Sequence, residues 1–563
     1  MKVKGVEALL RARIAFVFLV TATLVIGACA QQAKPGTSGS PAASLAGGEK
    51  PTPGGTLTFV VNAEPPSFDG HRETTFALLH PIAPHYSLLY KFDANDLTKV
   101  IPDVADGNPT VSADKMTVTI KLRQDVKFHD GTQMTSEDVK ATYDKIITPN
   151  TAAGQSSPRA GAYAVVSAVN APDKFTIEFK LKYPSASFLT NLASPWNFIY
   201  SAAKLKADPR WYEKNIMGTG PFTYVSNTKG QDWVGKKNPD YFGKDKDGTK
   251  LPYLDGYKAL IITDATAGVN AIRSKQAMIE FRGFTPQQRD DLSRALPNDL
   301  AIQEAPWICV NYVVPNTKVK PFDDVRVRQA LSLAIDRYAG GEALSKTTIV
   351  KDVGGLMRPK GPFAMSDADL AKIRGFGKDA AAAKAEAKKL LADAGVPNLS
   401  FKFLNRNITT PYEPVAVFLI DQWKQVGITA THDVKETSPY QADLRAGNFQ
   451  VALDFNCDFL DEPDLQLAKF WSASKAGKGL NFAYYDDDKL DGMIDAQSRQ
   501  TDPAQRVKLV GDIERYAMDE KAYQYPVLWW YRIIPYLKIV RGWQIGSNHY
   551  TNQDLTTVWL AKS

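Results

Sequence analysis

The sequence carries little net charge. Lysine and arginine number 68 and aspartate and glutamate 61, which gives a formal charge of +7 at pH 7. The first 29 residues contribute +3, so the rest of the chain carries only about +4, evenly spread. Nucleic-acid-binding proteins concentrate positive charge on one face. We therefore expect no nucleic-acid partner, and contents of 44% hydrophobic and 23% charged residues are ordinary for a soluble globular protein.

Long hydrophobic runs are also lacking. The longest begins at Ile14 and spans about 13 residues, whereas a helix that crosses a bilayer needs about 20. Lysines and arginines precede this run, and the small residues Gly27 and Ala28 lead to Cys29 at its end. A basic start, a short apolar core and small residues before a processing point are typical of a secretory signal.

The cysteine at the end of this segment resembles the bacterial lipoprotein signal, in which that cysteine is lipidated and becomes the mature N-terminus. We expect residues 1–29 to be such a signal, with Cys29 as the lipidation site; a plain signal peptide and a single membrane anchor are the alternatives. Residues 30–54 are rich in Gly, Ser, Pro, Ala and Gln. This composition cannot bury a core and predicts a flexible tether with a reach of about 25–30 Å. The expected location is extracytoplasmic, in the periplasm or lipid-anchored on the outer face of the cell membrane.

Cysteine is scarce, with three residues in 563. If Cys29 carries lipid, only Cys309 and Cys457 remain, so one bridge at most can form within the chain. An oxidising compartment permits it. Such a bridge would close a loop of about 150 residues, which in the loop-entropy model stabilises the fold by about 4–5 kcal/mol.

Motifs of the common enzyme classes are missing. The sequence has no nucleophile elbow, no zinc-binding His-Glu-x-x-His and no phosphate-binding loop. The spacing of His71, His80 and His85 matches no common metal-binding pattern, and we expect surface histidines. His129-Asp130-Gly131 follows a strand and predicts a tight turn rather than a catalytic or metal site. We expect no enzymatic activity, no metal and no cofactor.

Strand and helix patterns alternate along the chain. Residues 116–122 and 175–181 place apolar side chains at every second position, which predicts half-buried strands. Residues spaced as on one face of a helix follow Asp323 and Asp324, with further helices expected over 379–394 and 412–426. Strands are expected at 400–404 and 428–434. This alternation indicates an α/β class. The length of the chain predicts three or four domains.

Several separated segments together resemble the family 5 extracellular solute-binding proteins, the peptide- and nickel-binding receptors of ABC importers. The most specific is Pro321-Phe322-Asp323-Asp324-Val325-Arg326-Val327-Arg328-Gln329-Ala330-Leu331, which continues to 334–337. The others are 54–57 with 67–69, 122–131 with 135–139, 218–222, 237–241, 390–395 and 422–428. They occur in family order and cover almost the whole chain after the tether.

The resemblance implies a periplasmic-binding-protein-like bilobal fold, the large three-domain variant of type II, with the ligand cleft between the lobes. One lobe would comprise 55–86, 210–308 and 525–563, with a subdomain inserted at 87–209. The second lobe would comprise 309–524. The protein would be a monomer that closes on its ligand and delivers it to a membrane permease and ATPase. A tethered sensor or adhesin with the same fold is the alternative from another class.

The resemblance also implies site residues. Cys309 and Cys457 stand where oligopeptide-binding members carry a disulfide; two separate buried thiols are the alternative. Residues Glu73, Thr74, Thr75 and Phe76 fall where the first lobe offers the backbone of an edge strand to an extended ligand. Trp307 is expected as an aromatic wall. Arg358 could meet a ligand carboxylate or be a solvated loop arginine.

The ligand-binding segment departs from the family pattern. Peptide-binding members hold the peptide's α-ammonium with an Asp just before an Asp/Glu-Pro pair. Here the matching position is Phe459, and Asp458 is one residue away, which in an extended strand places its side chain on the other face. Either a local irregularity lets Asp458 take the role, or no N-terminal ammonium is bound. The sequence favours a peptide or peptide-like ligand, with sugars, small amphiphiles or metal chelates such as nickel as alternatives.

Overall fold

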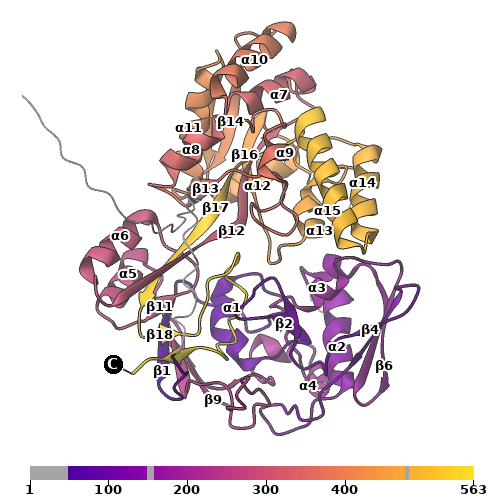
Figure 1. Ribbon diagram of the computed structural model, residues 1–563, viewed down its shortest axis with the longest axis vertical. Helices are drawn as coiled ribbons and strands as arrows, with labels where there is room; N and C mark the ends of the chain where they lie inside the picture. The colour runs from indigo at the N-terminus through magenta and orange to yellow at the C-terminus, as the bar shows by residue number, and fades with distance from the viewer. Residues whose placement is uncertain (1–48, 149–156, 476–480, 563) are drawn as a thin grey trace, which may run out of the picture. The chain divides into compact units, whose positions relative to one another are not determined.

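The computed structural model describes residues 49–148, 157–475 and 481–562 (Figure 1). The expected signal, Cys29 and most of the tether lie outside these residues. Within them, no helix combines the length and the hydrophobicity needed to cross a bilayer.

The first lobe is built on a five-stranded sheet with β1 near its middle. Phe59, Val60 and Val61 are buried on both faces, as expected for a strand covered on both sides. β1 runs parallel to both of its neighbours, β10 and β11. The strands in sheet order are β11 (Ile279–Glu280), β1 (Thr56–Val61), β10 (Gly256–Ile261), β9 (Asp232–Lys237) and β8 (Phe222–Thr228). The helices are α1 (Phe76–Ile82), α5 (Ala265–Arg273) and α6 (Pro286–Ala295).

The inserted subdomain has its own sheet and its own core. α2 begins with a capping box, in which Thr135 and Asp138 satisfy each other's backbone amides. The strands in sheet order are β4 (Thr110–Val111), β5 (Thr117–Lys121), β7 (Thr176–Leu181) and β6 (Val166–Asp173), beside the hairpin β2 (Tyr90–Phe92) and β3 (Val100–Pro102). The helices are α2 (Ser136–Ile147), α3 (Phe188–Leu192) and α4 (Ala202–Ala207).

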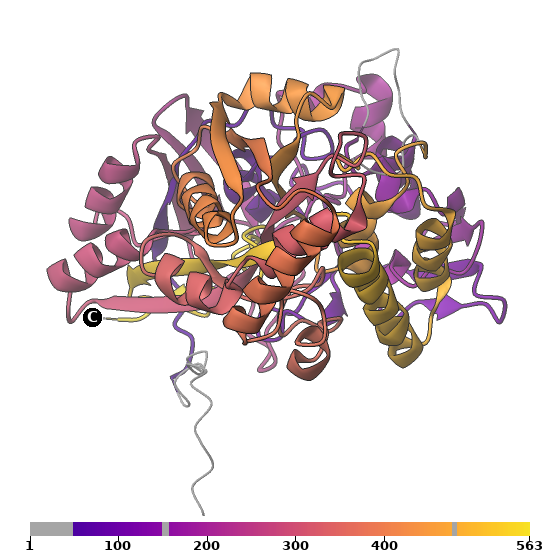
Figure 2. The same ribbon diagram turned by 90° about the horizontal axis from the view of Figure 1, so that it is seen from above.

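The second lobe is built on a six-stranded sheet whose two faces carry separate cores. Val313 points into one core, whereas Tyr312 and Val314 point into the other, the alternation that a strand imposes. Figures 1 and 2 show helices on both faces of this sheet. The strands in sheet order are β13 (Val350–Asp352), β17 (Tyr525–Leu537), β12 (Leu300–Pro315), β16 (Val451–Cys457), β14 (Ser400–Arg406) and β15 (Thr429–Lys435).

The helices of the second lobe begin where the sequence supplies caps. Asp324 accepts a hydrogen bond from the Arg326 amide at the start of α7, and Asp379 does the same for Ala382 at the start of α10. The helices are α7 (Val325–Leu333), α8 (Arg337–Leu344), α9 (Asp367–Leu370), α10 (Ala380–Asp393), α11 (Tyr412–Lys424), α12 (Thr437–Ala446), α13 (Pro463–Gln466), α14 (Asp488–Arg499) and α15 (Pro503–Glu514). A small ladder of β18 (Val540–Arg541) and β19 (Trp559–Leu560) lies near the C-terminus.

Two long antiparallel strands, β12 and β17, connect the two lobes. Leu300 pairs with Leu537 at the first-lobe end, and Val313 pairs with Tyr525 at the second-lobe end. The register shifts between Pro306 and Val310, so the ladder is interrupted at the crossing. This interruption is the natural place for the lobes to hinge.

One predicted boundary needs correction at this crossing. The sequence assigned 525–563 to the first lobe, but Tyr525, Val527, Leu528 and Trp530 lie in a core of the second lobe. Only from about Tyr531 does β17 pair with the first-lobe end of β12. The pattern of apolar residues along β17 does not change where the strand passes from one lobe to the other. The sequence therefore could not show the position of the boundary.

Away from the hinge, the second lobe meets the inserted subdomain along a rim. The Ser187 hydroxyl donates a hydrogen bond to Asp464 Oδ2 at 2.6 Å. Next to it, the Ala186 amide donates to the Ser498 carbonyl at 3.0 Å. The two lobes are therefore joined by direct hydrogen bonds at the rim as well as by the strands of the hinge.

Candidate functional site

Cys309 and Cys457 form a disulfide at the hinge. They face each other in the register of β12 and β16, with an S–S distance of 2.06 Å and a Cα–Cα distance of 4.2 Å. The bridge fixes β12 to the second lobe just beyond the break at Pro306, so it limits bending on that side of the hinge.

Trp307 lies inside the hinge rather than on an open wall. Its side chain is buried, and its ring centroid lies 5.7 Å from that of Trp530 and 5.4 Å from that of His549. The Arg532 guanidinium lies 5.9 Å from the same ring. Trp307 therefore shapes the floor of the hinge mainly through packing.

The expected edge strand at residues 73–76 is not formed. Thr75 is the N-cap of α1, and its Oγ1 accepts a hydrogen bond from the Ala77 amide at 3.2 Å. The Glu73 carbonyl accepts from Arg159 Nη2 at 2.6 Å, and the Thr74 carbonyl accepts from the Tyr550 hydroxyl at 3.3 Å. Two carbonyls of this segment thus have partners within the protein, and its pairing with an extended ligand stays a prediction.

Arg358 is paired within the protein. Its Nε and Nη2 donate to Asp461 Oδ2 at 2.9 and 2.6 Å. Its side chain is 12% exposed, so it is not a solvated loop arginine. Because Asp461 already accepts two hydrogen bonds from this guanidinium, a ligand carboxylate would have to compete with Asp461 for the same N–H groups.

A cavity of about 520 Å³ is lined by all three parts of the protein. The first lobe contributes Pro306 and 544–547, the inserted subdomain contributes 95–98, and the second lobe contributes residues that include Arg358 and Glu462. It is thus a cleft between the lobes, next to the hinge. A larger cavity of about 820 Å³ has no lining residue from the second lobe, so lobe closure would not enclose it.

A buried ion pair supports the second-lobe wall of this cleft. Glu462 and Arg506 are both nearly inaccessible, and the guanidinium of Arg506 donates to both carboxylate oxygens of Glu462. Burial raises the pKa of Glu462 to about 7. Arg506 also donates to Gln497 at 3.1 Å, and Gln497 donates to Asp464 at 2.6 Å, so the wall is connected to the rim.

Asp458 is a partly buried carboxylate beyond the end of β16. Its Oδ2 accepts a hydrogen bond from Asn456 Nδ2 at 3.2 Å, and burial raises its pKa to about 6. Lys469 lies near enough to oppose that rise, but its ion pair is with Asp454. Within the described part of the chain, Asp458 has no ion pair of its own.

Phe459, at the position expected for the ammonium-binding Asp, makes contacts across the lobes. Its side chain packs against the core of the first lobe, and its carbonyl accepts a hydrogen bond from Asn548 Nδ2 at 3.1 Å. The side chain at this position therefore joins the two lobes through apolar contact and offers no charge to a ligand.

The histidines are buried, and their expected exposure was wrong. His71, His80 and His85 are each no more than 1% exposed, and a ring nitrogen of each donates a hydrogen bond to a backbone carbonyl at 2.8 Å. Burial lowers the pKa of each to about 3, so they are neutral. Among the described residues, no three His, Cys, Asp or Glu side chains gather in a way that could hold a metal ion.

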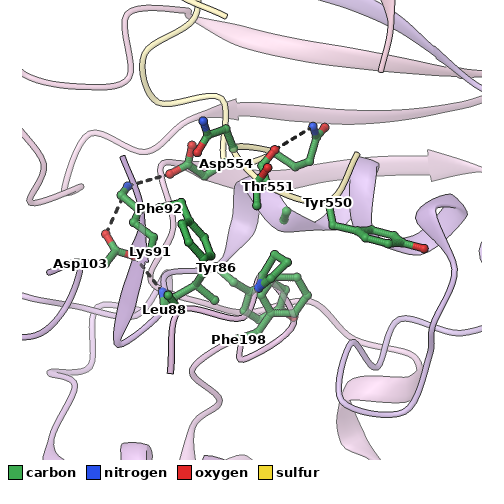
Figure 3. Close-up of a pocket in the computed structure, with 14 residues that line it drawn as sticks. Tyr86, Leu88, Lys91, Phe92, Asp103, Phe198, Tyr550, Thr551 and Asp554 are labelled. Atoms are coloured by element: carbon green, nitrogen blue, oxygen red, sulfur yellow. Dashed lines mark hydrogen bonds and ion pairs between the residues drawn. The ribbon is translucent and has the colours of Figure 1, made fainter. Parts of the chain in front are cut away.

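A third cavity lies between the inserted subdomain and the C-terminal segment (Figure 3). Lys91 stands at its edge between Asp554 at 2.7 Å and Asp103 at 3.4 Å. At about 40 Å³ this cavity can hold only a water molecule or two. Lys91 is therefore a structural connection between β2 and the C-terminal segment.

Comparison with known proteins identifies the family. Residues 99–478 match the model of the bacterial extracellular solute-binding proteins, family 5. The chain belongs to this family.

Relatives of this family 5 protein cover most of its length. The di/tripeptide-binding protein 2 of Pseudomonas aeruginosa is 28% identical over 490 residues, 82% of this chain and 87% of the relative. The periplasmic oligopeptide-binding protein OppA of Salmonella typhimurium is 26% identical, over 77% of this chain and 79% of the relative. The oligopeptide-binding protein AppA of Bacillus subtilis, solved with a nonapeptide, has a TM-score of 0.69 at 22% identity and shares the fold over 91% of this chain and all of that one.

Two arginines of this solute-binding protein that contact aromatic rings were not predicted from the sequence. Arg282 follows β11 in the first lobe, and Arg406 ends β14 in the second. Each guanidinium lies over an aromatic ring: Arg282 over Phe76, and Arg406 over Tyr412. Neither lies in a motif of the family resemblance, and a single arginine carries no periodic signal, so only the fold brings them to notice.

Arg328 follows an ion pair at the start of α7, in which Asp324 and Arg326 lie 2.5 Å apart. Arg328 itself is buried and donates to four backbone carbonyls, among them Phe322 and Lys521. It therefore ties the start of α7 to the segment before β17.

Proposed function

We propose that this protein is the peptide receptor of an ABC importer, which captures a peptide or peptide-like solute between its lobes and delivers it to a membrane permease. The observation that carries the proposal is the cleft of about 520 Å³ lined by both lobes in a chain of family 5. Ligand sites of small molecules commonly measure about 300–1,000 Å³. Relatives named for di- and tripeptides and for oligopeptides support the ligand class.

Closure follows from where the ligand would sit. A ligand that contacts both lobes gains its full binding energy only in the closed form, so it shifts the population toward that form. The break in β12 between Pro306 and Val310 is the proposed hinge. We propose that 55–86, 210–308 and about 531–563 move together, and that 309 to about 530 form the opposing lobe. The subdomain 87–209 moves with the first lobe.

Several candidate residues keep a proposed role in the cleft. Phe76 and Arg358 provide an aromatic face and a charged wall on opposite lobes. Asp458 is the carboxylate next to the family's ammonium-binding position and lacks an ion pair among the described residues. It is our candidate partner for a cationic group of the ligand.

The test of this receptor function is native mass spectrometry of the purified protein with any ligand that co-purifies. Peptides of mixed sequence are the expected result. A single defined sugar or a metal complex would contradict the peptide class. Asp458→Ala should weaken the binding of a cationic peptide, with exposed Asp247→Ala as the matched control; unchanged binding would exclude Asp458 as its partner.

We also propose that Cys29 carries the lipid anchor and that residues 30–54 tether the receptor to the membrane as a monomer. Replacement Cys29→Ser should move the protein from the membrane fraction to the soluble extracytoplasmic fraction. The mass of the N-terminal peptide of the native protein should include the lipid; an unmodified Cys29 would contradict the anchor.

A further inference from the structure

Two cavities outside the cleft join into one pocket. The cavity of about 820 Å³ and the cavity of about 40 Å³ share five lining residues, which are Lys91, Phe92, Asp103, Asn552 and Asp554. The smaller cavity is therefore the inner end of the larger one. We call the two together the outer pocket.

Two buried polar atoms at the inner end have no partner. Asn552 Nδ2 and Gln553 Oε1 are enclosed by the protein and form no hydrogen bond with a residue that the structure describes. Gln553 is only 3% exposed, and its Nε2 donates to the Thr551 carbonyl at 3.3 Å, which leaves Oε1 as its unpaired atom. Buried polar groups in folded proteins are rarely left unpaired, so these two atoms indicate a bound water or a ligand.

A hydroxyl group matches these two atoms. One N–H donor and one carbonyl acceptor line the same space of about 40 Å³, which is the size of a water molecule or two. A hydroxyl oxygen accepts from the amide N–H, and the hydroxyl proton is donated to the carbonyl oxygen. An ammonium, a carboxylate or a methyl group in this space would leave at least one of the two atoms unpaired.

Further hydrogen-bonding groups lead from the inner end into the wide cavity. The Lys91 ammonium lies 2.7 Å from Asp554 and 3.4 Å from Asp103 (Figure 3). An ammonium has three N–H groups, so two carboxylate partners leave one N–H for a ligand oxygen. The Tyr241 hydroxyl lines the wide cavity and forms no hydrogen bond within the described part of the chain.

The charges that line the outer pocket nearly cancel. Five cations and six carboxylates line the pocket, and most of them are paired with each other. Besides the Lys91 pairs, Arg123 lies 2.6 Å from Asp125, and Arg541 lies 3.1 Å from Glu49. A lining of balanced and paired charges gives no advantage to a strongly charged ligand, and it favours a neutral one.

We propose that the outer pocket is a second ligand site, which binds a neutral saccharide and takes one of its hydroxyl groups into the inner end. Asn552 and Gln553 hold that hydroxyl group, and Lys91 donates to a second ligand oxygen. A sugar ring also has apolar C–H faces, and the half-buried rings of Phe92 and Phe242 offer them apolar surface.

The outer pocket is separate from the cleft that we assign to peptides. Phe92 and Asn95 line both and form the wall between them. The residues that line the outer pocket come from the first lobe and the inserted subdomain, so a saccharide gains no contacts when the lobes close. A saccharide and a peptide should therefore bind at the same time.

NMR titration of the purified protein tests this site, with and without a bound peptide. The probes are maltotriose, triacetylchitotriose and permethylated maltotriose, whose methyl ethers cannot donate a hydrogen bond. The same titrations are run with Gln553→Met and Tyr241→Phe, and with the exposed Gln287→Met and Tyr224→Phe as matched controls. Sedimentation with insoluble cell-wall glycan, run with the same variants, distinguishes the end of a glycan strand from a free sugar.

We expect an unmodified trisaccharide or the glycan to bind equally well with and without peptide, and the permethylated probe to show no binding. Gln553→Met and Tyr241→Phe should each weaken saccharide binding about two- to tenfold, as the loss of one hydrogen bond does. Peptide binding should not change in these variants, and the two controls should bind saccharide like the wild type. If Gln553→Met does not fold, Tyr241→Phe decides, because it removes a single oxygen atom.

Three results would overturn the second site and leave the peptide receptor standing. They are the absence of saccharide binding in a protein that binds peptide, equal binding of the permethylated probe, and affinity unchanged in both variants. The first of these would show that the inner end holds only water. A saccharide that peptide displaces would lie in the cleft, which would overturn the outer pocket as its site.

Discussion

The positions of single side chains near the hinge depend on the fold. Asp458 and Phe459 are neighbours in sequence, yet one stays within the second lobe and the other packs on the first. The sequence predicts that this pair bears on the choice of ligand, and that stays a prediction. It did not reveal Arg282 and Arg406, because the residues that face them come from distant segments.

Asp458 should make stability depend on pH. Burial raises its pKa from 3.8 to about 6, so the folded protein holds this proton more tightly than the unfolded chain does. The stability that this provides is complete below pH 3.8 and is lost as the pH rises to about 6. Replacement Asp458→Asn should therefore stabilise the protein at pH 7 by about 1–2 kcal/mol, after allowance for partial exposure.

Urea unfolding at pH 4 and pH 7 measures this difference. The exposed Asp247→Asn is the control and should unfold like the wild type at both values. A variant Asp458→Asn that is less stable than the wild type at pH 7 would show that the carboxylate is stabilised, not strained, in the folded protein.

The buried pair Glu462–Arg506 should be sensitive to removal of one partner. Arg506→Met leaves the Glu462 carboxylate buried without a counter-charge, so the free energy of unfolding should fall by about 3–5 kcal/mol at pH 8. The loss should shrink at pH 5, where Glu462 can take up a proton. The double variant Glu462→Gln/Arg506→Met should recover much of the stability; if it is as unstable as the single variant, packing rather than charge is responsible.

At the scale of elements, the regular patterns were predictable and the irregular ones were not. The strands β5, β7, β14 and β15 and the helices α10 and α11 begin and end within about two residues of their predicted bounds, because alternation and capping are local properties. Residues 73–76, predicted to offer the backbone of an edge strand, lead into α1, which begins at Phe76. The buried histidines were expected at the surface, since no local pattern reports the burial of a lone polar residue.

The disulfide should stabilise the hinge element. Cys309→Ser/Cys457→Ser should lower the free energy of unfolding by about 2–5 kcal/mol, as loss of a native bridge usually does. Mass spectrometry of peptides from the non-reduced native protein should recover the linked pair. Two free thiols in the secreted protein would contradict the bridge.

At the scale of the whole molecule, the rim between the inserted subdomain and the second lobe should affect all ligands alike. Ser187→Ala removes one hydrogen bond to Asp464, so the closed form should weaken and every peptide should dissociate about five- to tenfold faster. Stopped-flow release of two unrelated peptides measures this. Ser293→Ala in α6, away from the rim, is the control; a change confined to one peptide would show that Ser187 contacts that ligand.

The path of β17 has a consequence for how the chain matures outside the cytoplasm. This strand pairs with β12 in both lobes, yet it lies at Tyr525–Leu537, close to the end of the sequence. Similarly, Cys309 can form its disulfide only with Cys457, which lies 148 residues further along the chain. The six-stranded sheet of the second lobe and the ladder at the hinge cannot be completed until β17 has been exported. Assembly of this part is therefore a late event in translocation, and a chain cut short before Tyr525 would lack the strand that pairs with both β12 and β13.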